Sequence, residues 1–179
     1  ESQGSHAMRE RLAGSLGVEE KNIKVVTNDV GGGFGLKMMC FPEYVATMFA
    51  SRALKRPVKW TSTRSEAFLS DSHGRDHVTE ASIAMDKEGN FLGVKVDTVA
   101  AVGAYLSQYG IFIPTLAGAG MHVGVYKIPV LYNKVNVVYT NTVPVDAYRG
   151  AGRPEASYVI ERLVDKAADD LGIDPVELR

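Results

Sequence analysis

The sequence predicts an α+β fold in which a mixed or antiparallel sheet packs against helices. Residues 76–86 and 91–105 alternate apolar and polar side chains on either side of the turn sequence Lys-Glu-Gly-Asn, which is the pattern of a β-hairpin. A helix is predicted to begin at Arg153 and to end at Gly172, because apolar residues recur along one face between them. The presence of both signals in one chain indicates the α+β class.

The other elements are predicted from periodicity and from glycine and proline positions. Two more helices are expected, one over about residues 7–16 and one from Pro42 to about Leu54. Gly17 suits the C-terminal cap of the first helix, and Lys55-Arg56-Pro57 stops the second. Further strands are predicted at residues 25–26, 58–63 and 134–141, residues 110–120 are expected to be irregular or briefly helical, and residues 147–156 are expected to form a loop.

Charge balance and cysteine content exclude several classes of protein. The 179 residues, 45% of them hydrophobic, suffice for one compact domain or for two small lobes. With 20 basic and 21 acidic residues the net charge is −1, so a nucleic-acid surface is not expected. Cys40 is the single cysteine, so neither a disulfide framework nor a cysteine-rich metal site can form within the chain. We interpret Cys40 as a buried structural thiol.

The two termini and the hydropathy of the chain indicate where the protein is located and whether the chain is a fragment. No apolar run reaches the roughly 20 residues of a spanning helix, and the first residues lack the pattern of a signal peptide, so a cytoplasmic protein without a membrane span is expected. The chain opens without an initiator methionine, and Asp174-Pro175 begins a helix that has no room to finish. Residues 1–179 are therefore interpreted as a single fragment of a longer protein, truncated at both ends.

A glycine loop at residues 31–35, interrupted only by Phe34, follows the predicted strand at residues 25–26. Its spacing fits neither the phosphate-binding P-loop nor the dinucleotide fingerprint G-x-G-x-x-G. Because glycines carry no Cβ, backbone N–H groups here can approach a ligand closely. The alternative is a glycine-rich bend with Phe34 packed in the core, and the local sequence leaves both interpretations open.

An arginine loop at residues 147–156 is the second candidate site. Small residues follow Arg149, which leaves its guanidinium accessible for an anion or a carbonyl group, although pairing with a surface acid is the more common role of a lone loop arginine. His73 and His77 have a spacing that would bind metal on a helix, but their surroundings predict a loop and a strand, so no metal site is expected.

The motifs GGGFGLK, PEYVA and AYRGAGRPEA, in this order, resemble those of the molybdenum-binding large subunit of the xanthine dehydrogenase and aldehyde oxidase family. The resemblance covers nearly the whole chain and is closest to the large chains of carbon monoxide dehydrogenases. It implies that the chain is part of a molybdopterin-binding domain. It also implies an enzyme that inserts water-derived oxygen into a C–H bond of an aldehyde, a similar carbonyl compound or an N-heterocycle.

The resemblance assigns roles to residues of the glycine loop. Phe34 and Gly35 match the family's Phe-Gly pair, which packs at the metal centre and offers backbone N–H groups to the cofactor. Gln3 matches the glutamine that hydrogen-bonds the apical oxo ligand. Gly32 and Gly33 shape the loop, and the molybdenum is held through the pterin rather than by a residue of this chain.

In the arginine loop, Arg149 matches the arginine that orients substrate in some relatives. Copper-containing carbon monoxide dehydrogenases carry a cysteine at the next position, where this chain has Gly150, so copper-dependent oxidation of carbon monoxide is the less favoured alternative. Met38 stands where xanthine dehydrogenases have a purine-recognising glutamate. Ala151 replaces an aromatic residue of purine oxidisers, which also argues against a purine substrate.

The resemblance implies partners as well. Electrons would pass to an iron–sulfur subunit and an FAD subunit, and the assembled complex would be a homodimer that also contains the remaining domains of this subunit. The cofactor is expected to be the cytosine dinucleotide form of molybdopterin. The general-base glutamate lies beyond this chain, so the fragment alone is expected to be inactive and to lack the cofactor. A non-redox module that binds a nucleotide or phosphate, and a purely structural scaffold, remain the alternatives.

Overall fold

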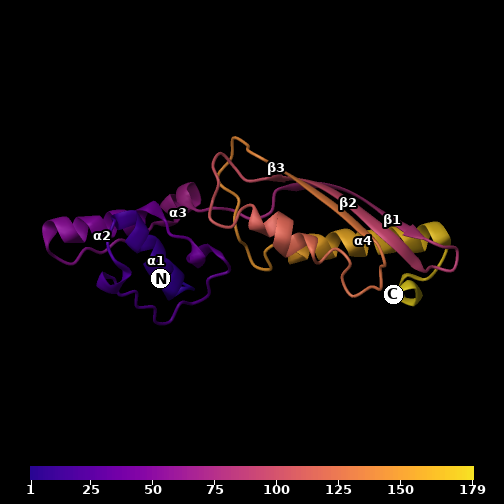
Figure 1. Cartoon of the computed structure of the whole chain (residues 1–179), viewed down its shortest axis with the longest axis horizontal. Coiled ribbons are helices and arrows are strands. Elements are labelled where there is room, and N and C mark those ends of the chain that lie inside the picture. Colours follow the sequence, from indigo (N-terminus) through magenta and orange to yellow (C-terminus); the bar gives the residue numbers. More distant parts are fainter. The chain divides into compact units, whose positions relative to one another are not determined.

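A mixed three-stranded sheet with a long helix against one face dominates the C-terminal part of the chain (Figure 1). The computed structural model describes residues 1–179 and divides them into two compact units, Glu1–Asp71 and Ser72–Arg179. The first contains helices α1 (Ser5–Leu16), α2 (Pro42–Leu54) and α3 (Arg64–Ser70). The second contains strands β1 (His77–Met85), β2 (Phe91–Ala101) and β3 (Leu131–Val138) with helices α4 (Arg153–Leu171) and α5 (Pro175–Leu178). The predicted α+β class is confirmed.

The sheet of the second unit has the order β1-β2-β3, in which β1 and β2 are antiparallel and β2 and β3 are parallel. The predicted hairpin turn forms because the Asp86 carboxylate accepts hydrogen bonds from the backbone N–H groups of Glu88 and Asn90. The prediction of a mixed sheet with a β1–β2 hairpin is thus confirmed.

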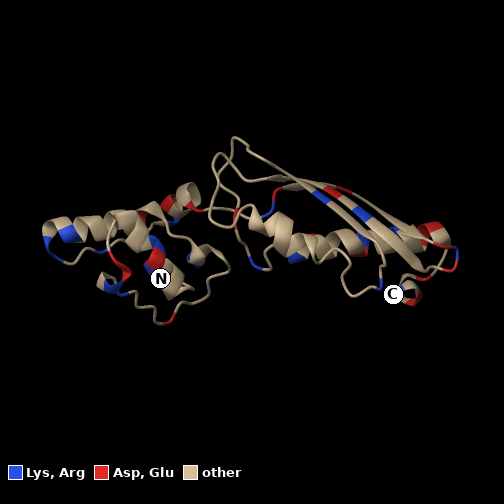
Figure 2. Cartoon of the chain, in the orientation of Figure 1, with Lys and Arg blue, Asp and Glu red and all other residues tan.

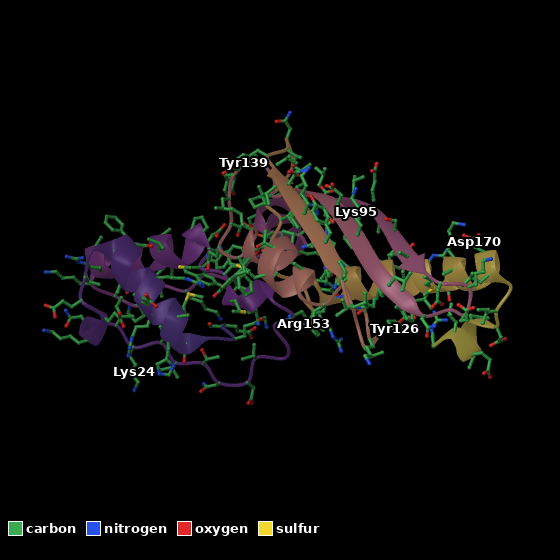
Figure 3. The ribbon with its side chains drawn as sticks, turned by 45° about the vertical axis from the view of Figure 1, so that its right-hand side comes forward. Lys24, Lys95, Tyr126, Tyr139, Arg153 and Asp170 are labelled. Carbon is green, nitrogen blue, oxygen red and sulfur yellow. The ribbon has the colours of Figure 1, made fainter.

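Alternation along β2 determines which face of the sheet is covered. Val94 and Val96 point to the covered face and pack with Ile160 and Val164 of α4. Lys95, labelled in Figure 3, lies between these valines on the opposite face of the sheet. Its ammonium group is 5.9 Å from the ring centroid of Tyr132 on β3. Alternate residues thus separate a buried core from an exposed face that carries both charged and apolar side chains, Val78 and Val99 among the latter.

The first unit has its own small core. Met8 and Leu12 of α1 are buried together with Ile23, and Tyr44 and Met48 of α2 pack against this cluster. Helix α1 ends at Gly17, whose φ of +62° belongs to the left-handed conformation of a C-terminal cap. Helix α2 has the predicted bounds.

Two predicted strands, at residues 25–26 and 58–63, are wrong. Neither segment pairs with another backbone, although Val25, Val26, Val58 and Trp60 line a groove of about 590 Å³ in the first unit. A β-branched sequence favours extended backbone, but a strand also needs a partner, and none is present within these residues. The long strand predicted to reach residue 105 ends at Ala101, because Gly103 with a φ of +84° turns the chain. Strand β3 lies three residues earlier than predicted.

One further element was not predicted, and another agrees with its prediction. Helix α3 was not predicted, yet its start is marked by a capping box in which Thr63 and Glu66 bond each other's backbone N–H groups. Residues Ile113–Ala117 form a π-helical turn within the segment that was expected to be irregular or briefly helical.

The charged groups do not gather by sign. Figure 2 shows acidic and basic residues interspersed along both units, in agreement with the net charge of −1. None of the helices combines the length and the hydropathy that a membrane-spanning segment needs.

The capping box makes a local prediction. Thr63→Ala removes the side chain that accepts from the Glu66 N–H group, and we expect the stability of α3 to fall by about 1 kcal/mol. Hydrogen exchange of the amides of residues 64–70 measures this change. Ser62→Ala is the matched control, because Ser62 bonds only the Thr63 carbonyl oxygen and should leave exchange unchanged. Equal exchange in both variants would contradict the assignment of the cap.

Candidate functional site

The glycine loop (residues 31–35) turns sharply and leaves its aromatic residue at the surface. The φ angle is positive at Gly31, Gly32, Phe34 and Gly35. For Phe34, with a φ of +52°, this conformation costs about 1–2 kcal/mol. The side chain is nevertheless 56% exposed, so the cost is not offset by burial, and the alternative of a Phe34 packed in the core is excluded. Strain without burial is typical of residues held for a function.

Gln3 lies directly on the glycine loop. Its side-chain Oε1 accepts a hydrogen bond from the backbone N–H of Gly35 at 3.2 Å, and its own backbone N–H donates to the Lys37 carbonyl oxygen at 3.1 Å. A Cβ at Gly33 would overlap the Gln3 amide, with Cδ only 2.7 Å away. A side chain at position 33 would therefore displace the Gln3 amide from its present position. The structure therefore brings together Gln3, Gly33 and Gly35, which lie 32 or fewer residues apart in sequence.

The orientation of the Gln3 amide follows from this hydrogen bond. Because Gly35 N–H uses Oε1, the donor group Nε2 is the part of the amide that remains for an external acceptor. The side chain is exposed, so such an acceptor can reach it.

The Lys37 side chain connects the residues before and after the glycine loop, and no role was predicted for it from the sequence. Its ammonium group donates to the Val30 carbonyl oxygen and forms an ion pair with Glu1. The hydrogen bond to Lys37 lowers the pKa of the Glu1 carboxyl group below its ordinary value. A lysine two residues after a glycine run is the one signal that could have identified it.

In the arginine loop predicted at residues 147–156, residues 147–152 are non-helical and residues 153–156 form the first turn of α4. The loop contains three successive residues with positive φ, namely Gly150, Ala151 and Gly152. Gly152 is closely packed: a Cβ there would lie 2.6 Å from the Ile113 carbonyl oxygen. Arg149 is exposed at the start of this turn. The path of the loop is therefore fixed by backbone packing, whereas the Arg149 side chain lies at the surface.

Arg75 contacts the arginine loop from a distant part of the chain. No role was predicted for this residue from the sequence. Its guanidinium donates to the Arg149 carbonyl oxygen at 2.5 Å, pairs with Glu155 at 3.2 Å and lies 4.7 Å from the Tyr148 ring centroid. These partners are about 75 residues away along the chain, so no local pattern announces them. The guanidinium can make all three contacts because it is planar and carries several donors.

The surroundings of His73 and Cys40 are not those of a metal ligand or a reactive thiol. His73 forms a bridge with Val145 and lies in irregular backbone, so the helical metal spacing with His77 does not apply. Cys40 is partly buried beside the core of the first unit, and burial raises the pKa of its thiol. A raised pKa keeps the thiol protonated and unreactive.

We predict that acid lowers the stability of the second unit, because the side chains of His77 and His122 are buried there. Burial lowers the pKa of both side chains, and their mutual repulsion lowers that of His122 further, whereas the charges of Glu155 and Asp76 partly restore that of His77. Below the ordinary pKa of about 6.5, the unfolded chain binds protons that the folded chain resists. We expect stability to be fully present above pH 6.5 and to fall as the pH drops below it. Denaturant titrations at pH 7.5 and 5.5 test this; His77→Gln with His122→Gln should flatten the difference.

The proposed site residues divide between the two units. Gln3, Gly32, Gly33, Phe34 and Gly35 belong to Glu1–Asp71, where they form one surface. Arg149 belongs to Ser72–Arg179, where Arg75 fixes its backbone.

Comparison with known proteins gives a consistent result. The family model of the molybdopterin cofactor-binding domain matches residues 1–179. The chain is 36% identical to the gamma subunit of the 6-hydroxypseudooxynicotine dehydrogenase complex of Paenarthrobacter nicotinovorans, over 97% of the chain and 22% of that protein. It is 38% identical to the carbon monoxide dehydrogenase large chain of Hydrogenophaga pseudoflava, over 99% of the chain and 22% of that protein.

A solved structure agrees with these sequences. Quinoline 2-oxidoreductase from Pseudomonas putida 86 superimposes with a TM-score of 0.91 at 35% identity, over 99% of this chain and 23% of that one. The chain thus spans less than a quarter of the length of the relatives that it matches. Sequence, fold and motifs agree, and the chain belongs to the molybdopterin cofactor-binding domain family.

Proposed function

We propose that this chain is part of the catalytic large subunit of a molybdenum hydroxylase that oxidises an aldehyde or an aromatic N-heterocycle with water-derived oxygen. The observation that carries the proposal is the contact between Gln3 and the glycine loop, in a chain of the molybdopterin-binding family. A side-chain amide, strained glycines and an exposed phenylalanine meet there on one surface.

The residues of this surface fit a molybdopterin centre. The glycines at positions 32, 33 and 35 leave the loop without Cβ atoms, so backbone N–H groups can approach a ligand closely, and the Gln3 Nε2 group adds a donor. A bound molybdopterin supplies two-electron oxidation of a substrate C–H bond. The Nε2 group of Gln3 would hold the centre, whereas the Gly35 N–H would act indirectly by fixing the Gln3 amide through its hydrogen bond to Oε1. The exposed Phe34 ring would exclude water from one side of the centre.

Arg149 is proposed to orient the substrate. Its backbone is held by Arg75, so the guanidinium extends from a fixed point of the arginine loop. A guanidinium donates to a carbonyl oxygen or to a ring nitrogen, which aldehydes and N-heterocycles respectively present. Both of these acceptors are uncharged. Arg149 is therefore proposed to hold the substrate in place by a hydrogen bond and not to neutralise a negative charge.

Copper-dependent oxidation of carbon monoxide is disfavoured by packing as well as by composition. A cysteine at position 150 would need a Cβ where Gly150 has a φ of +91° and where the ring of Pro154 comes within 2.5 Å. The thiol that such a copper site requires therefore has no room without a change in the arginine loop. The similarity to a carbon monoxide dehydrogenase large chain supports the shared fold and cofactor class, not that substrate.

Two of the relatives support a heterocyclic substrate. Quinoline 2-oxidoreductase is named for an aromatic N-heterocycle, and the dehydrogenase of 6-hydroxypseudooxynicotine for a pyridine compound, at identities equal to that of the carbon monoxide enzyme within a few per cent. Met38, half-buried beside the glycine loop, offers no carboxylate for purine recognition. We therefore place pyridines and quinolines beside aldehydes as candidate substrates.

The partner subunits and the chemical form of the cofactor are proposed from membership of the same family. Several relatives are named as the large chain or gamma subunit of a complex, which supports separate iron–sulfur and FAD subunits. The cytosine dinucleotide form of the cofactor and a homodimeric assembly are part of the proposal, as is a general-base glutamate in the segment that the relatives have beyond this domain. Residues 1–179 by themselves are proposed to be inactive and to retain no cofactor.

The test uses the full-length protein purified with its partner subunits. We expect molybdenum without copper, and oxidation of one member of a panel of aldehydes, pyridines and quinolines. Arg149→Met should lower kcat/KM for that substrate and leave the molybdenum content unchanged. Copper alongside molybdenum would refute the inference from Gly150. Nucleotide binding with neither metal would favour the non-redox binding module.

A further inference from the structure

A small, partly open cavity lies within the second unit, at the N-terminal end of α4. Its volume is about 20 Å³, and Thr79, Thr98, His122 and Glu155 are among the side chains that line it, together with His77. A water molecule needs roughly 10–15 Å³ of such space and two to four polar partners, so the cavity has room for one water and no larger molecule.

Two buried polar atoms of residues that line this cavity have no hydrogen-bond partner within the protein. They are the Nδ1 atom of His122 and the Oε2 atom of Glu155, both fully inaccessible to solvent. His122 as a whole is only 7% exposed, so its ring cannot turn to bulk water for a hydrogen bond. Buried polar atoms are paired in folded proteins, because an unmade hydrogen bond is costly.

The partners of the neighbouring atoms are already fixed. The other carboxylate oxygen of Glu155 pairs with Arg75, so Glu155 cannot satisfy Oε2 by rotating without breaking that pair. The hydroxyl groups of Thr79 and Thr98 lie 3.1 Å apart, and one donates to the other. One hydroxyl hydrogen of this threonine pair is therefore left over.

We propose that one buried water molecule bridges His122 and Glu155 in this cavity. Water donates two hydrogen bonds, one to His122 Nδ1 and one to Glu155 Oε2, and its oxygen accepts the remaining hydroxyl hydrogen of the threonine pair. Both of the unpaired acceptors are then satisfied. This assignment requires that the imidazole of His122 carries its proton on Nε2.

The water would act on the arginine loop through Glu155 and Arg75. Arg75 donates to the Arg149 carbonyl oxygen, and the loop closes through a hydrogen bond from Ala151 N–H to the Tyr148 carbonyl oxygen at 2.7 Å. A rotation of Glu155 would remove one of the three contacts that hold Arg75 at this turn. Glu155 and His122 are therefore positioning residues for the loop, and this role does not depend on what the loop binds.

Acid should disrupt the bridge. Protonation of His122 at Nδ1 turns the acceptor into a donor, which the water can then no longer bond in the same way. The charged and titratable groups that face His122 and its neighbours are His77, Asp76, Glu155 and Arg75. The carboxylates favour this protonation, whereas the cations oppose it.

The first test is a crystal structure of the full-length protein at a resolution that shows ordered waters. We expect one isolated peak within hydrogen-bonding distance of both His122 Nδ1 and Glu155 Oε2. A direct hydrogen bond between these two side chains, or a cavity without a peak, would overturn the proposal.

The second test compares hydrogen exchange in peptides that cover residues 147–153. Glu155→Gln weakens the link to Arg75, and His122→Phe removes the acceptor of the water; each should speed exchange about tenfold. Glu161→Gln is the control, because Glu161 lies on the same helix but bonds Tyr126 and Arg179. Because one network carries both effects, the double variant should exchange no faster than Glu155→Gln. Additive effects, or wild-type exchange in His122→Phe, would show that no bridge connects them.

Discussion

Gly33→Ala in the full-length protein is expected to lower turnover about 100-fold, because a displacement of about 1 Å in a positioning group has this effect. The new methyl group would overlap the Gln3 amide and push the Gln3 side chain away. The hydrogen bond that Gln3 Oε1 accepts from Gly35 N–H would then be lost. The donor that Gln3 offers would then point elsewhere. Measurement of kcat together with the molybdenum content separates poor chemistry from poor loading.

The control for this experiment is Gly14→Ala in helix α1. No atom lies within 4 Å of a Cβ at Gly14, and alanine favours a helix, so activity should be unchanged and stability slightly increased. If Gly33→Ala retained wild-type turnover, Gln3 would have no part in the reaction. Loss of activity in both variants would indicate a general effect on the first unit rather than on the site.

Gly103→Ala is expected to destabilise the second unit by about 3 kcal/mol or more. Its φ of +84° alone costs an alanine about 1–2 kcal/mol. The added Cβ would also overlap the Val143 carbonyl group and approach Pro144 Cα to 2.5 Å, and backbone atoms cannot move aside as a flexible side chain does. Denaturant unfolding followed by circular dichroism measures the loss.

Gly120→Ala is the matched control within the same unit. The atom nearest to the added methyl group would be the Leu116 carbonyl oxygen at 3.9 Å, so the change in unfolding free energy should be within about 0.5 kcal/mol. A change of less than 1 kcal/mol in Gly103→Ala, against the roughly 3 kcal/mol expected from strain and overlap, would mean that the chain at Val143 and Pro144 is free to shift.

Elements that depend on local signals were predictable from the sequence. Helix α2 starts at Pro42 and stops before the Lys-Arg-Pro sequence, and helix α4 ends at Gly172, whose φ of +68° is that of a cap. The β1–β2 hairpin likewise depends on a turn that Asp86 closes from within. In these cases the residues that determine the structure lie within a few positions of it.

Features that depend on distant residues were not predictable in the same way. The strands at residues 25–26 and 58–63 have the right composition, but pairing depends on a partner backbone that a local pattern cannot reveal. Arg75 contacts the arginine loop across 74 residues. A role for Gln3 at the metal centre was expected only from a resemblance, because an isolated glutamine carries no chemical signature, and its hydrogen bond from Gly35 was not predicted.

The two unpaired segments have a consequence for the behaviour of the chain in solution. Extended backbone that pairs with no other strand is a template on which another chain can add one, and segments rich in Val, Thr and Trp are prone to ordered aggregation. Lys24 and Lys59, both exposed within or beside these segments, oppose such stacking by charge repulsion. Replacing them with uncharged residues would therefore favour fibril formation, and high salt would act in the same direction.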